Sequence, residues 1–207
     1  MAFIKKQNTE SVVQEERKQT RECPDLLANL EADNAIARRW AARDLVNCPD
    51  VASALVERLK REEDLSVREV ILTTLTRLGD STAVAGLVDC LHSEDAALRN
   101  EAIEAMKQLP DEVAPIMRGL LADHDLDVRI FAVNILESLR HPDVESWLIE
   151  VIETDAHVNV CATALDLLSE VGTALAREPL ARLMARFPDE PYIQFAAELA
   201  LRRIHES

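Results

Sequence analysis

Three histidines stand in similar acidic surroundings along the chain, and their residue types could ligate a metal ion. His92, His124 and His157 each lie within three residues of an aspartate or a glutamate. A zinc ion needs all of its ligands at about 2 Å, whereas we expect these segments to be turns of separate stacked units, roughly 10 Å apart. We therefore predict a solvated acidic edge and no metal site. The carboxylates of this edge are Glu94, Asp95, Asp123, Asp125, Asp127, Glu153 and Asp155.

The cysteines form no pattern typical of a metal or redox site. Cys23, Cys48, Cys90 and Cys161 are scattered without a CxxC pair, so we expect free and mostly buried thiols in a reducing compartment. Cys23 and Cys48 precede Pro-Asp at equivalent places in neighbouring units, and the same separation argument keeps them apart. The chain has no glycine-rich phosphate loop and no recognisable nucleophile set. We predict no catalytic residues and no cofactor.

The composition excludes some classes of fold and disfavours some classes of ligand. Aromatic residues make up 3% of the 207 residues and there are four glycines, which argues against a compact β-rich core. The formal charge of −15 disfavours nucleic acid and anionic membranes as ligands, because both are bound through Lys and Arg. The start has no apolar run of signal-peptide length, and no stretch approaches the ~20 apolar residues of a membrane span. We expect a cytoplasmic protein.

A short phrase recurs along the chain at a nearly fixed period. "DLSVR" at 64–68 and "DLDVR" at 125–129 are its clearest copies, and weaker copies align with them. The last residue of each copy, which we call the key position, recurs at steps of 30, 31, 30, 30 and 35 residues. Such a period is the signature of a solenoid of repeated units. The key positions are Arg38, Arg68, Arg99, Arg129, Asn159 and Gln194.

Each unit is expected to contain two helices. Apolar residues stand one before, three after and seven after most key positions, which is helical spacing, so a helix B follows each phrase. Pro-Asp pairs, which favour a first helical turn, mark several starts of a preceding helix A. In the fifth unit Asp166 falls at a core position, so we predict a rotated helix B with Leu165 and Leu168 facing inward.

The phrase itself is predicted to be structural. Its aspartate stands where helix B begins and can cap free N–H groups, which is worth about 1 kcal/mol. Its Val or Leu enters the core, and its arginine can reach an acidic residue of the adjacent turn. The capping residues in the clearest units are Asp64, Asp95, Asp125 and Asp155.

Residues 77–106 and 170–204 resemble the short HEAT-like repeats of many bacterial and archaeal proteins and of phycobilin lyase subunits. The resemblance covers about 24–205 and implies an all-α, right-handed α-solenoid of about six two-helix repeats, with helices B lining its concave side. A HEAT-repeat hydroxylase holds iron with repeated His-Glu pairs, but this chain has such a pair only at His205-Glu206. HEAT-like DNA glycosylases need a basic groove, and this chain is acidic.

The partner-binding surface is predicted on the face of helix B that the core does not use. The positions one and five after the key position share this face, which in HEAT-like units is usually polar and looks into the groove. In the last three units Ile130, Val160 and Phe195, flanked by Ala164 and Leu199, would form an apolar strip, and such strips mark contact sites. The remaining predicted site residues are Asn134 on the same face and Arg39 and Arg43 in the first unit.

We therefore expect a non-catalytic scaffold or adaptor whose groove holds a helix or extended peptide of a protein partner, with Arg39 and Arg43 holding an acidic group. Alternatives are burial of the strip within the protein and a homodimer. At the level of function, the alternatives are a lyase-like or chaperone role for a bilin and a regulatory subunit of an enzyme. Residues 1–22 are expected to be a polar arm, helical from about Thr9 or disordered, before the repeats at 23–207.

Overall fold

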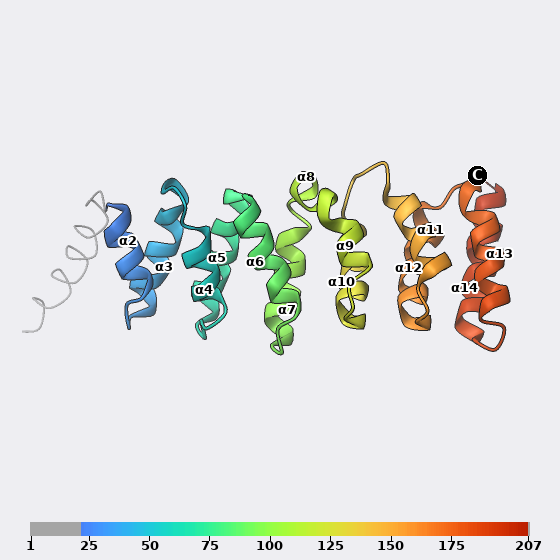
Figure 1. The fold of residues 1–207 in the computed structure, drawn as a ribbon, viewed down its shortest axis with the longest axis horizontal. Helices are drawn as coiled ribbons and strands as arrows, with labels where there is room; N and C mark the ends of the chain where they lie inside the picture. Colours follow the sequence, from blue (N-terminus) through green and yellow to red (C-terminus); the bar gives the residue numbers. More distant parts are fainter. Residues whose placement is uncertain (1–21, 207) are drawn as a thin grey trace, which may run out of the picture. The chain divides into compact units, whose positions relative to one another are not determined.

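The computed structural model describes residues 22–206, and its regular structure there is entirely helical (Figure 1). The chain divides into two compact units, 1–74 and 75–207, with the boundary inside helix α5. The predicted arm, up to residue 21, lies outside the described residues. No helix in the described part is long and apolar enough to cross a membrane.

Unit 1 contains two helix pairs around a leucine-rich core. Helix α2 packs against both α3 and α4, and Leu30, Leu45, Leu55, Leu59 and Ile71 are fully buried. The elements are α2 (Cys23–Leu30), α3 (Ala35–Asp44), η1 (Leu45–Asn47), α4 (Ala52–Leu59) and the first part of α5 (Leu65–Leu78).

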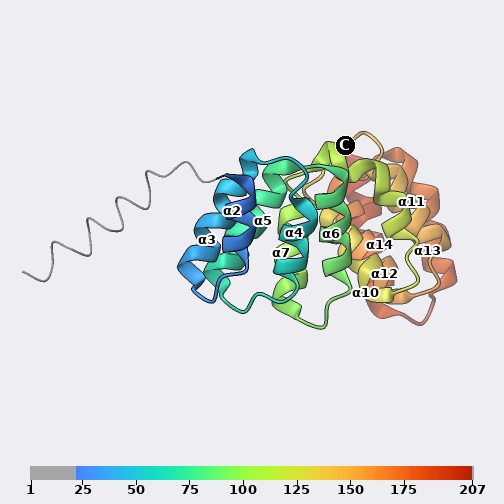
Figure 2. The ribbon, with the colours of Figure 1, turned by 60° about the vertical axis from the view of Figure 1, so that its left-hand side comes forward.

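Unit 2 repeats the same hairpin in two layers. The second helices of successive repeats, α7, α10, α12 and α14, pack against one another in that order, and α11 packs against α13 in the layer of first helices. Figure 2 shows α11 beside α12 and α13 beside α14. The elements are α6 (Ser81–Leu91), α7 (Ala96–Met106), α8 (Pro110–Val113), η2 (Ala114–Ile116), α9 (Met117–Leu121), α10 (Leu126–Leu136), α11 (Val144–Thr154), α12 (Val158–Val171), η3 (Ala174–Ala176), α13 (Arg177–Arg186) and α14 (Pro191–Glu206).

This order confirms the prediction of an α-solenoid of about six two-helix repeats within residues 22–206. The predicted caps are confirmed at Asp64, Asp95 and Asp125, whose Oδ1 atoms accept backbone N–H groups two residues further on at 2.9 Å. Asp155 makes the same contact, because its Oδ1 accepts the backbone N–H of His157 at 2.8 Å, although α12 begins one residue later, at Val158. The Asp155 carboxylate also accepts hydrogen bonds from Arg129, the arginine of the previous repeat.

Two of the phrase arginines, Arg38 and Arg129, join one repeat to the next, as predicted. Arg38 Nε and Nη2 each donate to Glu62 carboxylate oxygens at 2.7 Å, and Arg129 Nε donates to Asp155 Oδ2 at 2.7 Å. Arg38 Nη1 also donates to the carbonyl of Ala32 at 2.9 Å. Because a guanidinium has five N–H donors in a fixed fork, one side chain serves both its own turn and its neighbour's carboxylate.

The fifth key position lacks an arginine, and Arg186 of α13 takes over its role. Its Nη1 donates to the carbonyl of Glu153 at 2.6 Å, and its Nη2 donates to the carbonyl of Asp155 at 2.8 Å. Arg186 also lies 2.9 Å from the Sγ atom of Cys161. Burial raises the pKa of the Cys161 thiol, and the positive charge of Arg186 opposes this shift without cancelling it. A protonated, buried thiol is a poor nucleophile.

The prediction of a free Cys23 and Cys48 was wrong, because the two form a disulfide with a Cα–Cα distance of 5.8 Å. The separation argument applied the spacing of packed helix axes, but Cys48 lies in extended backbone before α4. A loop can approach α2 more closely than a helix axis does, and 5.8 Å is within the range for disulfides. Cys90 and Cys161 are buried and form no disulfide, as expected.

Thiol titration tests this disulfide. In denaturant without reductant, we expect two of the four cysteines to react with a thiol reagent, and all four to react after reduction. Alkylation and peptide mass spectrometry should assign the two reactive thiols to Cys90 and Cys161. Four reactive thiols in protein purified under oxidising conditions would contradict the pairing of Cys23 with Cys48.

Candidate functional site

The predicted apolar strip across the last three second helices is interrupted in the structure. Val160 and Ala164 have no exposed surface, whereas Phe195 is 62% exposed and Leu199 is 50% exposed. Ile130 is half-buried. The prediction that Val160 and Ala164 line a groove was therefore wrong, and Phe195 and Leu199 remain as an exposed apolar pair on α14.

The physical reason is a rotation of α12 about its axis. Leu165 and Leu168 are fully buried, as predicted for a rotated helix, and Asp166 is exposed. Because a buried unpaired carboxylate is costly, the helix turns Asp166 to the surface. The same turn carries Val160 and Ala164 into the core.

Helix α14 presents an apolar face, which we call the α14 face, made of Tyr192, Phe195 and Leu199. The spacing of three and four residues places them on one side of the helix, and each is at least half exposed. The Tyr192 hydroxyl donates a hydrogen bond to Asp166 of α12. This hydrogen bond raises the pKa of Tyr192, and it ties the α14 face to the neighbouring helix.

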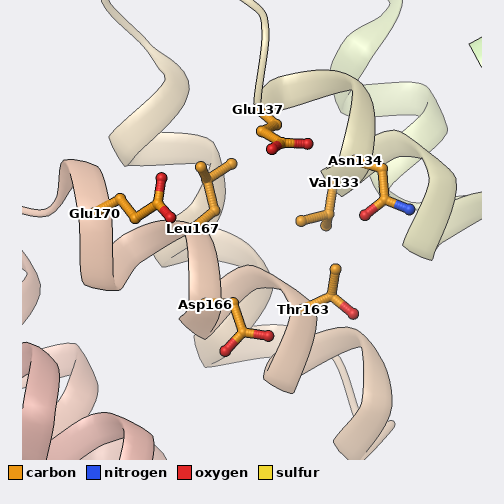
Figure 3. A pocket seen from close by; sticks show the side chains of 7 residues that line it. All are labelled: Val133, Asn134, Glu137, Thr163, Asp166, Leu167 and Glu170. Carbon is orange, nitrogen blue, oxygen red and sulfur yellow. The ribbon is translucent and has the colours of Figure 1, made fainter. Parts of the chain in front are cut away.

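Beside this face lies a pocket of about 210 Å³ between α10 and α12, which we call the acidic pocket. Figure 3 shows the side chains of the two helices facing each other across it. Sequence reasoning predicted one lining residue, Asn134, for a binding role. The pocket is lined by Val133, Asn134, Glu137, Thr163, Asp166, Leu167 and Glu170.

The three carboxylates of the acidic pocket, Glu137, Asp166 and Glu170, were not predicted as site residues. The sequence spacing of two of them, Asp166 and Glu170, does indicate a shared helix face. Thr163, Asp166 and Glu170 follow one another at three and four residues, which places them on one face of α12. Glu137 lies three residues after Asn134 and is the C-cap residue of α10. The Nζ atom of Lys107 lies 3.7 Å from Glu137 Oε2. Among the described residues, the lining of the pocket contains three carboxylates and no Lys or Arg, so the pocket favours a positively charged ligand.

The predicted cationic residues Arg39 and Arg43 are both exposed, on α3 of unit 1. Arg43 Nη2 lies 2.6 Å from Asp44 Oδ1, and its guanidinium lies 4.2 Å from the centre of the Trp40 ring. Arg43 is therefore already paired with a carboxylate and an aromatic ring. Their predicted role toward an acidic group of a partner stays a prediction.

The acidic edge of unit 2 brings side chains of successive turns closer than the sequence argument assumed. His92 Nε2 lies 3.8 Å from Asp123 Oδ2, and the rings of His92 and His124 stack with centroids 6.0 Å apart. His124 Nδ1 lies 3.0 Å from Asp123 Oδ1. Within the described residues, no group of three or more His, Cys, Asp or Glu side chains is arranged to hold a metal ion.

Comparison with known proteins finds the HEAT repeats family at residues 23–107, 52–130 and 113–202. Over 74 residues the chain is 38% identical to the bilin biosynthesis protein PecE of Nostoc sp. (strain PCC 7120) and 39% identical to PecE of Mastigocladus laminosus. These matches cover 35% of the chain but only 29% and 28% of the two relatives. The archaeal HEAT-like repeats protein from Thermococcus onnurineus NA1 has a similar fold, with a TM-score of 0.51 at 18% identity over 95% of this chain and 92% of that one.

Proposed function

The chain belongs to the HEAT repeat family, and from that premise we propose that it is a protein-interaction scaffold whose binding surface combines the α14 face with the acidic pocket. The observation that carries the proposal is the exposure of Tyr192, Phe195 and Leu199 on one side of a helix. Single exposed apolar residues are ordinary on a protein surface, whereas a contiguous apolar group with a polar border is typical of a contact site.

The position of the surface also supports the proposal. It lies on the second helices α10, α12 and α14, which form one layer of unit 2. Ile130, Asn134, Phe195 and Leu199 keep the role proposed for them, with Ile130 half-buried at the edge. Aromatic residues are enriched among the residues that contribute most to binding energy at protein interfaces. Phe195 is the best candidate for such an anchor.

The double change Phe195→Asp/Leu199→Asp tests the proposed surface. We expect proteins retained from a lysate of the source organism by the immobilised wild-type chain to be lost from this variant, because the change replaces an apolar anchor by two charges. Quantitative mass spectrometry of the retained proteins is the measurement, and loss of an anchor corresponds to a weakening of about 30-fold or more.

The matched control is Leu175→Asp, at a site on η3 of the same unit where the leucine is 73% exposed. It introduces the same kind of charge outside the proposed surface and should retain the wild-type set of proteins. If the double variant also retains that set, with a wild-type circular dichroism spectrum, the proposed surface is not the binding surface.

A bilin-binding role is the second candidate, and the similarity to PecE favours it. The matched segment covers less than a third of either relative, so the role of the whole relative is not carried over with it. Adding the chain to free biliverdin distinguishes the two candidates. A shift of the bilin absorbance bands would support a bilin-handling protein, and unchanged spectra at high protein concentration would remove this candidate.

A further inference from the structure

We infer that the surface formed by the α14 face and the acidic pocket binds a cationic amphipathic helix of a partner protein. The inference rests on the proposed scaffold function and names the chemistry of its partner. An apolar flank of the partner helix lies on Phe195 and Leu199, and its Lys and Arg side chains reach Asp166, Glu170 and Glu137.

The spacing of the two groups of side chains matches a helix as the occupant. On α14 Leu199 stands seven residues after Tyr192, with Phe195 between them, and on α12 Glu170 stands seven residues after Thr163, with Asp166 between them. Seven residues of helix rise about 10.5 Å, or two turns. The surface therefore offers an apolar row and an acidic row of equal length on neighbouring helices.

The hydrogen bond from Tyr192 to Asp166 sets the two rows side by side. Helices α12 and α14 are the second helices of successive repeats and pack directly against each other. One turn after this pair, Glu170 follows on α12 and Phe195 follows on α14. A partner helix lying across α12 and α14 would meet exposed carboxylates of α12 on one flank and apolar side chains of α14 on the other, which defines it as amphipathic and basic.

The charges around the acidic pocket favour a partner segment that carries positive charge. Glu137 and Glu170 are exposed at the rim of the acidic pocket. Lys107, which lies beside Glu137, also lies 3.0 Å from the Oε1 atom of Glu104, so its charge is shared between two carboxylates. Because like charges close together repel one another, a partner that brings Lys or Arg relieves the repulsion, whereas an acidic partner adds to it.

Fluorescence anisotropy with synthetic helical peptides tests the inference on the full chain. The probe is a labelled peptide of about 18 residues, or five helical turns, with Lys and Arg on one flank and Leu and Phe on the other. Two control peptides replace either all basic residues by Glu or all apolar residues by Ser. We expect the cationic amphipathic peptide to bind at least tenfold more tightly than either control.

Paired substitutions locate the binding. Glu137→Gln/Glu170→Gln should weaken the cationic peptide about tenfold and reduce the salt dependence of its Kd, since two attracting charges are removed. Glu94→Gln/Glu150→Gln makes the same chemical change at exposed positions of the same unit outside the pocket and should leave the Kd unchanged. Equal weakening by both pairs would show attraction to the acidic chain in general and overturn the inference.

Two further outcomes are informative. A peptide of residues 1–22, which contains Phe3, Ile4, Lys5 and Lys6, should not displace the probe; displacement at equal concentration would make the chain's own segment the occupant and overturn the inference. Failure of the cationic peptide to bind, while Phe195→Asp/Leu199→Asp still loses its retained proteins, would overturn the partner chemistry and leave the scaffold function standing.

Discussion

Replacing Val160 by aspartate is expected to unfold unit 2, whereas the same replacement at Phe195 should leave it folded. Val160 has no exposed surface and lies among the core residues of α12. An aspartate there must either bury a charge without a partner or take up a proton, and such changes are in the most destabilising class, above about 4 kcal/mol. Urea unfolding followed by circular dichroism measures the loss.

The control is Phe195→Asp, which adds the same side chain at a position that is 62% exposed. Its free energy of unfolding should stay within about 0.5 kcal/mol of the wild type, as for most surface changes. The comparison decides between the observed burial of Val160 and its predicted position in the groove, which followed from the regular spacing of the repeats. Equal, small effects of both changes would show that Val160 is not part of the core.

The repeat architecture could be predicted because its determinants are local in the sequence. The aspartate that caps a helix and the arginine that follows it recur with the repeat, so Asp64 and Arg38 could be given their roles without coordinates. The hydrogen bonds of Arg38 to Glu62 and of Arg129 to Asp155 confirm this reasoning. Capping depends on a spacing of two residues, and the ion pairs between adjacent turns, 24 and 26 residues apart, depend on the repeat period. Both kinds of spacing are visible in a sequence.

The binding surface was harder to predict because it depends on how a whole helix is turned. The regular spacing of the repeats placed Val160 in the groove and Asp166 in the core. Because Asp166 is too polar for a core position, α12 turns about its axis, and the structure buries Val160 and exposes Asp166. Leu165 and Leu168 signalled the rotation, and following it through would have buried Val160. The acidic pocket could then be predicted from the sequence, because a rotation of α12 that exposes Asp166 also exposes Glu170 on the same face.

The disulfide was not predicted from the sequence for a different reason. Whether Cys23 and Cys48 meet depends on the path of the short connection between η1 and α4, and a spacing rule for packed helices says nothing about such a connection. Loop geometry is set by the packing at both of its ends. It therefore has no signature in the residues of the loop alone.

Glu62→Gln is expected to lower the free energy of unfolding of unit 1 by about 3 kcal/mol, because it leaves buried arginine without its countercharge. The Glu62 side chain is fully buried and accepts hydrogen bonds from Arg38, from Arg58 Nε at 2.8 Å and from the backbone N–H of Asp64 at 3.0 Å. The neighbouring Glu63→Gln changes an exposed carboxylate and should have little effect. A loss as small as that of the control would show that the buried pair contributes nothing to stability.

The pH dependence of unfolding provides an independent test of the buried interaction between Glu62 and its arginines. Burial by itself raises the pKa of Glu62, but the hydrogen bonds from Arg38, Arg58 and Asp64 outweigh it and lower the pKa from 4.5 to about 2. Since the folded-state pKa lies below the unfolded value, the stabilisation is fully present above pH 4.5 and is lost as the pH falls toward 2. A difference of this size corresponds to about 3 kcal/mol. Urea unfolding between pH 6 and pH 2.5 should therefore show a steeper loss of stability for the wild type than for Glu62→Gln, and parallel curves for the two proteins would refute the low pKa.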